Sequence, residues 1–167
     1  PVTSLAFVGQ TMVTSMVSFP LLAVPFFMLA GSVMETGGLS KRLIAVGEEL
    51  VGRFTGGLAI VTIVTCLFFG AISGSAPATV AAIGTIMIPA MVDKHYSKEY
   101  STGLSAVSGG LGVIIPPSIP FVFYGLSTNQ SIGTLFMAGI VPGFLIAMLL
   151  ILVSSVICRK RGYKGNG

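Results

Sequence analysis

Three long stretches of this chain carry no charged residue, and they limit what it can fold into more than any other feature. They cover residues 1–34, 54–92 and 100–158, and all nine Lys and Arg and all five Asp and Glu residues lie outside them. A helix needs about 20 apolar residues to cross the ~30 Å hydrocarbon core of a bilayer. Only 8% of the residues are charged, against about 25% in an ordinary soluble domain. We therefore predict an all-α polytopic membrane protein.

The same composition excludes several other classes. Cys66 and Cys158 are the only cysteines, too few for a disulfide scaffold. The net charge of +4 sits in short clusters between apolar stretches, which is typical of loops at a membrane surface rather than of a nucleic-acid interface. His95 has no second His or Cys nearby. We expect no catalytic constellation and no cofactor, and hence no enzyme.

The first stretch fits one crossing. We predict a transmembrane scaffold helix within residues 1–34, crossing near residues 12–33, with Pro20 and Pro25 as kink sites. Because the chain begins at Pro1 inside an apolar stretch, without an initiator Met or a signal-peptide pattern, we expect a piece of a longer membrane protein. Residues 35–54 follow as an amphipathic arm helix at the membrane interface, with Leu43, Val46, Leu50 and Phe54 at helical spacing. A solvated connector helix is an equally weighted alternative.

The second stretch is too long for one span, and Gly, Ser and Pro crowd its middle around Ser73-Gly74-Ser75. We divide it into arms at residues 57–69 and 79–91, each covering about 20 Å. Arms of that length fall short of the core, so residues 55–92 are predicted to form a re-entrant hairpin. Two complete spans joined by a tight polar turn remain open as an alternative.

The third stretch is predicted to hold two crossings. Three prolines between Pro116 and Pro120 remove backbone donors, so residues 100–126 form a broken transmembrane helix that unwinds around residues 114–120. Residues 127–134 are a polar turn on the far side. Residues 135–158 return as a transmembrane helix, whose start at 135–140 is alternatively a short interfacial piece, and 159–167 form a basic tail.

The charge distribution tests this topology. One crossing, a hairpin that returns, and two further crossings bring residues 35–54, the loop 93–99 and the tail to one face. All nine Lys and Arg then lie on that face. The positive-inside rule makes it cytoplasmic, and the turn at 127–134 periplasmic.

Non-helical backbone at membrane depth persists only where protein or a water-filled cavity satisfies it. The two predicted breaks would together supply neutral oxygens for a small hard cation, from the hydroxyls of Ser73 and Ser75 and from freed carbonyls near Gly112 and Ile115. Half-helices that begin near Thr79 and Ser118 would present hydroxyls and amides to a carboxylate. The sequence therefore predicts an ion and substrate site where the two breaks meet.

Four segments resemble one known family, the large membrane subunit of tripartite ATP-independent periplasmic (TRAP) transporters. They are GSVMETGGLSKRL at 31–43, FGAISGSA at 69–76, IPAM at 88–91 and IPPSI at 115–119. The resemblance implies one inverted repeat of an elevator-type ion transporter, with a re-entrant helical hairpin and a broken transmembrane helix. In this family the position of Thr79 usually holds an acidic residue. This chain therefore has a neutral hydroxyl where the family usually has a negative charge.

The resemblance also implies a function. It implies sodium-driven uptake of organic acids such as C4-dicarboxylates, sialic acid or other sugar acids across the bacterial inner membrane. A periplasmic binding protein and a small membrane subunit would be the partners. By motif, a sodium site would comprise Ser73, Ser75, Gly112, Ile115 and Pro117, and the substrate would lie near Ser75, Thr79 and Ser118. Alternatives from other classes are a channel with a re-entrant loop and a non-transporting structural subunit.

Overall fold

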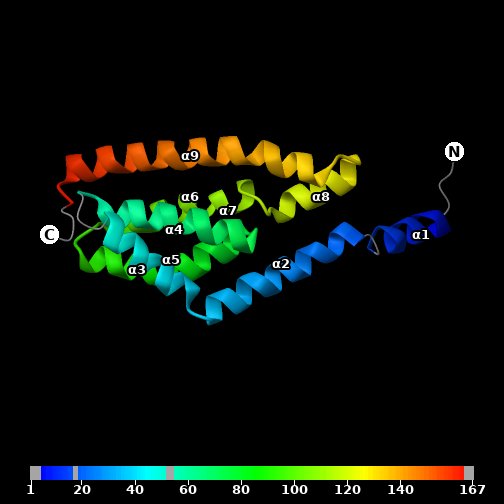
Figure 1. Cartoon of the computed structure of the whole chain (residues 1–167), viewed down its shortest axis with the longest axis horizontal. Coiled ribbons are helices and arrows are strands. Elements are labelled where there is room, and N and C mark those ends of the chain that lie inside the picture. Colours follow the sequence, from blue (N-terminus) through cyan, green and yellow to red (C-terminus); the bar gives the residue numbers. More distant parts are fainter. Residues whose placement is uncertain (1–4, 17–18, 52–54, 164–167) are drawn as a thin grey trace.

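The computed structural model describes residues 5–16, 19–51 and 55–163, and within these ranges every regular element is an α-helix. Figure 1 shows an elongated bundle in which helices from distant parts of the sequence lie side by side. The helices are α1 (Leu5–Met16), α2 (Phe19–Thr36), α3 (Leu39–Val51), α4 (Gly57–Ser73), α5 (Ala76–Asp93), α6 (Lys98–Gly109), α7 (Leu111–Ile114), α8 (Ile119–Thr128) and α9 (Ile132–Arg161). The prediction of an all-helical chain with long apolar helices is confirmed.

The hairpin is formed by α4 and α5, and only Gly74 and Ser75 separate the two helices. Gly74 adopts φ +63°, a left-handed conformation that glycine reaches without strain, and its N–H donates to the Gly70 carbonyl at 2.8 Å. Pro77 lies in the first turn of α5, where a missing N–H costs no helical hydrogen bond. The arms are therefore 17 and 18 residues long rather than the predicted thirteen.

Arms of 17 and 18 residues do not fall clearly short of the bilayer core. At 1.5 Å per residue the arms extend about 25 and 27 Å, close to the thickness of the hydrocarbon core. By length and composition α5 and α9 could each cross a membrane, and α4 belongs to the shorter apolar helices. Whether the hairpin re-enters or spans stays a prediction.

The predicted break in the third stretch is present. The helical segment Lys98–Ile114 and α8 meet at an angle of 42° across residues 115–118, which include a cis Pro116–Pro117 peptide bond. Ser118 has an extended conformation and caps α8, accepting a hydrogen bond from the Phe121 N–H at 3.4 Å. The unwound segment is shorter than predicted because Ile119 and Pro120 already belong to α8, in whose first turn proline is tolerated.

Two boundaries near the third stretch differ from the prediction. The turn covers residues 129–131 rather than 127–134, with Asn129 in a left-handed conformation and Ser131 capping α9. α9 then runs for 30 residues as one helix with Pro142 inside it, so residues 135–140 are not a separate interfacial piece. A proline inside a membrane helix is tolerated because neighbouring helices can satisfy the backbone groups that it frees.

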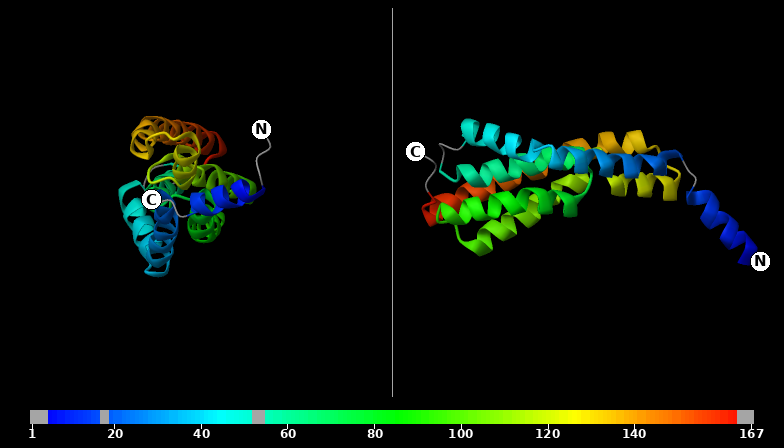
Figure 2. Two further views of the ribbon diagram at one scale, coloured as in Figure 1. Left: turned by 90° about the vertical axis from the view of Figure 1, so that its right-hand side faces the viewer. Right: turned by 90° about the horizontal axis from the view of Figure 1, so that it is seen from below.

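The first stretch forms two helices rather than one helix over residues 12–33, and its single crossing of a membrane stays a prediction. α1 ends at Met16 and α2 begins at Phe19, and the residues between them lie outside the described ranges. Figure 2 shows α1 projecting away from the bundle. Pro25 lies inside α2 as expected, whereas Pro20 lies in its first turn.

The arm helix α3 packs against α4 through Ile44 and Gly47, both buried. A Cβ on Gly47 would lie 2.9 Å from Val61 Cγ1, so the helices approach closely here. Val46, placed on the apolar face by its spacing, is 58% exposed instead. Phe54 lies outside the described residues, and position at a membrane interface stays a prediction.

The core surrounds α4, which contacts α2, α3, α5, α6, α7 and α9. Cys66 and Cys158 are buried and unpaired, as expected. Large apolar side chains of α9 are more than half exposed along one side of the helix, among them Met137, Val141, Met148 and Leu152. Such a surface suits lipid rather than water.

The charged segments 93–99 and 159–161 meet at one end of the bundle, as the parity argument requires. Tyr163 accepts a hydrogen bond from the Ser97 N–H at 3.2 Å, and Arg161 donates to the Ser97 hydroxyl at 3.2 Å. Burial raises the pKa of Tyr96 in this loop to about 12, while the Arg161 guanidinium lowers the pKa of Tyr163. The hairpin therefore returns the chain to the end from which it started.

Candidate functional site

The hairpin turn and the helix break, far apart in sequence, lie against each other. The Gly74 carbonyl at the turn accepts a hydrogen bond from the Ile119 N–H, just after the break, at 3.2 Å. On the other side, a Cβ on Gly70 would lie 2.5 Å from the Cα of Gly112. No side chain fits there, so two glycines allow the backbones of α4 and α7 to touch.

Three oxygens form a compact group inside the hairpin turn. The hydroxyls of Ser73 and Thr79 lie 3.0 Å apart, and the Thr79 hydroxyl donates to the Ser75 carbonyl at 2.8 Å. The Ser73 hydroxyl lies 3.3 Å from the same carbonyl. Ser73 is 3% exposed and Thr79 fully buried. Hydroxyl and carbonyl oxygens gathered this closely are the ligand type that hard cations take.

The break contributes further backbone to this group. The Pro117 carbonyl oxygen lies 2.7 Å from where a Cβ on Gly74 would stand. A Cβ on Gly112 would lie 2.8 Å from the Thr79 hydroxyl and 3.3 Å from the Ser75 carbonyl. Gly112 and Pro117 thus border the turn, as the motif implied.

Two other residues of the break face elsewhere. The Ile115 side chain packs towards α9, where a Cβ on Gly143 would lie 2.7 Å from its Cγ1. Ser118 is fully buried, and its hydroxyl donates to the Val113 carbonyl while it caps α8. Its hydroxyl is therefore committed to the backbone of the break.

Some of the predicted site residues therefore lie at the junction, and others do not. Ser73, Ser75, Gly112 and Pro117 surround the junction, and Ile115 flanks it. Of the three residues expected near the substrate, Ser75 lines a cavity, whereas Thr79 and Ser118 are buried in hydrogen-bond networks. Sodium and substrate binding at these residues stay predictions.

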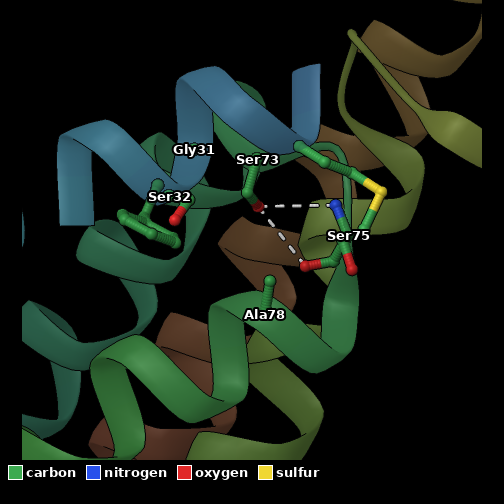
Figure 3. A pocket seen from close by; sticks show the side chains of 7 residues that line it. Gly31, Ser32, Ser73, Ser75 and Ala78 are labelled. Carbon is green, nitrogen blue, oxygen red and sulfur yellow. Dashed lines mark hydrogen bonds between the residues drawn. The ribbon is translucent and has the colours of Figure 1, made fainter. Parts of the chain in front are cut away.

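The cavity beside the turn has a volume of about 190 Å³, and none of its described lining residues is charged. Figure 3 shows Gly31 and Ser32 of α2 facing Ser73 and Ser75 of the turn, with Ala78 in the first turn of α5. Met28 and Phe69 complete the lining. Sequence reasoning assigned α2 to a scaffold and missed this contribution, although Gly31-Ser32 is a small, polar pair within an apolar helix.

Among the described residues, no group of three or more His, Cys, Asp or Glu side chains lies close enough to hold a metal ion. A cation at this junction would therefore be held by neutral hydroxyl and carbonyl oxygens.

Helices long and apolar enough to cross a bilayer, one of them broken, define an integral membrane protein. Residues 2–167 match the family described as "Tripartite ATP-independent periplasmic transporter, DctM component". The chain belongs to this family, which confirms the resemblance found in its motifs.

Curated relatives agree with this assignment. The chain is 54% identical over 160 residues to the isethionate TRAP transporter permease of Oleidesulfovibrio alaskensis, covering 96% of the chain and 25% of that protein. It is 48% identical over 157 residues to the C4-dicarboxylate large permease of Vibrio cholerae, covering 93% of the chain and 35% of the relative. It is 42% identical over 161 residues to the sialic acid large permease of the same species, covering 96% of the chain and 38% of that relative.

The chain therefore spans between a quarter and two fifths of the length of these relatives. All three are named as transporter permeases, and none of them is named as an enzyme.

Proposed function

We propose that the chain forms part of a sodium-coupled transporter that takes up small organic acids across a bacterial inner membrane. Its partners would be a periplasmic binding protein and a small membrane subunit, and its Lys- and Arg-bearing loops would be cytoplasmic. The names of relatives support C4-dicarboxylates, sialic acids or a small sulfonate as candidate substrates. The observation that carries the proposal is the group of oxygens from Ser73, Ser75 and Thr79 beside the break.

An organic anion in the cavity needs a compensating positive charge. None of the described residues that line the cavity is charged, so an organic anion entering it would lose hydration without meeting a positive side chain among them. A sodium ion held at the turn would supply that charge. Binding of the anion would then require the cation, which is the thermodynamic basis of coupled transport.

The elevator mechanism belongs to the same proposal. Close contacts join the hairpin to the broken helix: Gly70 meets Gly112, and a Cβ on Gly109 would collide with the Val80 side chain. Such interlocked contacts favour movement of α4 to α8 as one unit. A cross-link between α4 and α7 should then preserve uptake, whereas one between α2 and the hairpin should stop it.

The test is uptake into proteoliposomes by the complete transporter with its binding protein, under an inward sodium gradient. The two turn variants Ser73→Ala and Thr79→Val should each raise the sodium concentration needed for half-maximal uptake, with unchanged expression, because each removes a hydroxyl of the oxygen group. Ser127→Ala is the matched control, because Ser127 is exposed on α8 and its hydroxyl bonds only the Phe123 carbonyl. Unchanged sodium activation in both turn variants would refute the site, and unsaturable, sodium-independent flux would favour a channel.

A further inference from the structure

The helix α2 reaches the hairpin turn at a single close contact. A Cβ on Gly31 would lie 3.2 Å from the Cα and 3.3 Å from the Cβ of Ser73, closer than side-chain atoms ordinarily pack. Gly31 is buried, while its neighbours Ala30 and Ser32 are exposed. The absence of a side chain at residue 31 therefore brings the next residue, Ser32, to the edge of the cavity beside the turn.

Three hydroxyls line this cavity, and they differ in what they already bind. The Ser73 hydroxyl is engaged within the turn, with Thr79 and Ser75. Among the described residues, the hydroxyls of Ser32 and Ser75 make no hydrogen bond. Two uncommitted donors thus reach one cavity from separate helical elements, the first from α2 and the second from the turn.

The size and lining of the cavity indicate what it can hold. A volume of about 190 Å³ corresponds to roughly six water molecules at their liquid volume of about 30 Å³ each. Met28, Phe69 and Ala78 supply an apolar wall, and the hydroxyls supply the polar groups. A small organic anion fits this chemistry, with an acidic oxygen towards the hydroxyls and its carbon atoms against the apolar wall.

We propose that Ser32 of α2 contacts the substrate, donating to an acidic oxygen of the anion from the side of the cavity opposite Ser75, and that Gly31 positions it. This inference rests on the proposed transport function and adds a residue from the helix that sequence reasoning assigned to the scaffold. A substrate held between α2 and the hairpin would also contact both sides of the interface that elevator movement opens.

The test introduces Ser32→Cys into the complete transporter, in a background whose other accessible cysteines are replaced. The two cysteines of this chain, Cys66 and Cys158, have no exposed surface and add little background. A small charged methanethiosulfonate is applied in choline, in sodium, and in sodium with isethionate, succinate or sialic acid. At ten times the half-saturating concentration of the transported acid, labelling should slow about tenfold, because only about one site in eleven is free.

Ser127→Cys is the matched control: it is exposed outside the cavity and should label equally in every condition. Ser32→Ala should raise the KM for the acid about 10-fold or more, the usual cost of one hydrogen bond to a charged group, and leave the maximal rate nearly unchanged. Ser127→Ala should change neither quantity.

Each outcome decides the proposal. If Ser32→Cys is not labelled at all, or is labelled at one rate in every condition while wild-type uptake depends on sodium, Ser32 does not contact the substrate. If the acid protects Ser32→Cys but wild-type uptake is independent of sodium, the contact stands and the proposed coupling fails.

Discussion

The contact between Gly70 and Gly112 provides the sharpest test of how the hairpin and the break are joined. Replacement of Gly70 by Ala would place a Cβ 2.5 Å from the Cα and 2.8 Å from the amide nitrogen of Gly112. Carbon atoms pack best at about 3.5–4.0 Å. Since both neighbours are backbone atoms within helices, α4 and α7 must separate by about 1 Å, at a cost of roughly 1–3 kcal/mol or more for overpacking.

That separation acts directly on the proposed ion site. Gly112 borders the Thr79 hydroxyl and the Ser75 carbonyl, so moving α7 withdraws one wall of the oxygen group. A loss of about 1.4 kcal/mol in binding free energy corresponds to a tenfold change in affinity. We expect Gly70→Ala to raise the sodium concentration for half-maximal uptake at least about tenfold, measured in proteoliposomes with the binding protein present.

Gly103→Ala is the matched control, a change of the same kind within a helix. A Cβ at residue 103 would meet nothing within 4 Å, so its sodium activation should equal that of the wild type. If Gly70→Ala is expressed and shows the same sodium activation as Gly103→Ala, the hairpin and the break are not joined as described, and the reasoning is refuted.

Three further predictions concern neighbouring contacts. Thr79→Val removes the hydroxyl between Ser73 and the Ser75 carbonyl and should raise the sodium concentration needed for uptake. Thr85→Val on the same helix is the control, because Thr85 is exposed and its hydroxyl donates to the Ala82 carbonyl. Equal sodium-activation curves for the two variants would contradict the role of Thr79. Ser118→Ala removes the cap of α8 and should lower stability by about 1 kcal/mol, seen as a lower Tm in detergent, and an unchanged Tm would count against it. Gly56 has a φ of +78°, and a Cβ there would lie 2.7 Å from the Cβ of Cys158. Gly56→Ala should therefore lower the Tm more than Gly103→Ala does. The reverse order would be inconsistent with the packing of α4 on α9.

The positions of the two breaks were predictable from local chemistry. Gly74 and the adjacent prolines Pro116 and Pro117 disfavour a continuous helix, and the structure has its breaks there. The extents of the breaks were less predictable. Pro77 and Pro120 read as helix breakers in the sequence, yet each lies in the first turn of a helix, where proline is compatible with helical geometry.

The location of glycine contacts could not be read from the sequence. Gly70 and Gly112 look like ordinary small residues of membrane helices, and only the fold reveals that their backbones touch. The same holds for Gly31, whose contact with Ser73 brings α2 to the site. Spacing also misjudged α3, where Ile44 rather than Val46 faces the core, because neighbouring helices decide which face is buried.

Residue identity indicated that the candidate site is lined by hydroxyl groups. It did not indicate which hydroxyls are already hydrogen-bonded and which are free to bind a ligand. Ser73 and Ser75 lie at the hairpin turn, and sodium binding by them stays a prediction. Thr79 and Ser118 also bear hydroxyls, but their burial in backbone networks became visible only once the turn and the break were brought together. Hydrogen-bond partners across such a junction depend on contacts between distant segments, which local sequence does not encode.

The central claim is that the hairpin turn and the helix break together hold a sodium ion. Cryo-electron microscopy of the complete transporter, at a resolution that shows bound ions and in matched sodium and choline buffers, tests it most directly. The account predicts a density in sodium alone, in contact with the Ser73 hydroxyl and with backbone oxygens of Ser75 and Pro117. Bound sodium elsewhere in the protein, with this junction identical in both buffers, would contradict it.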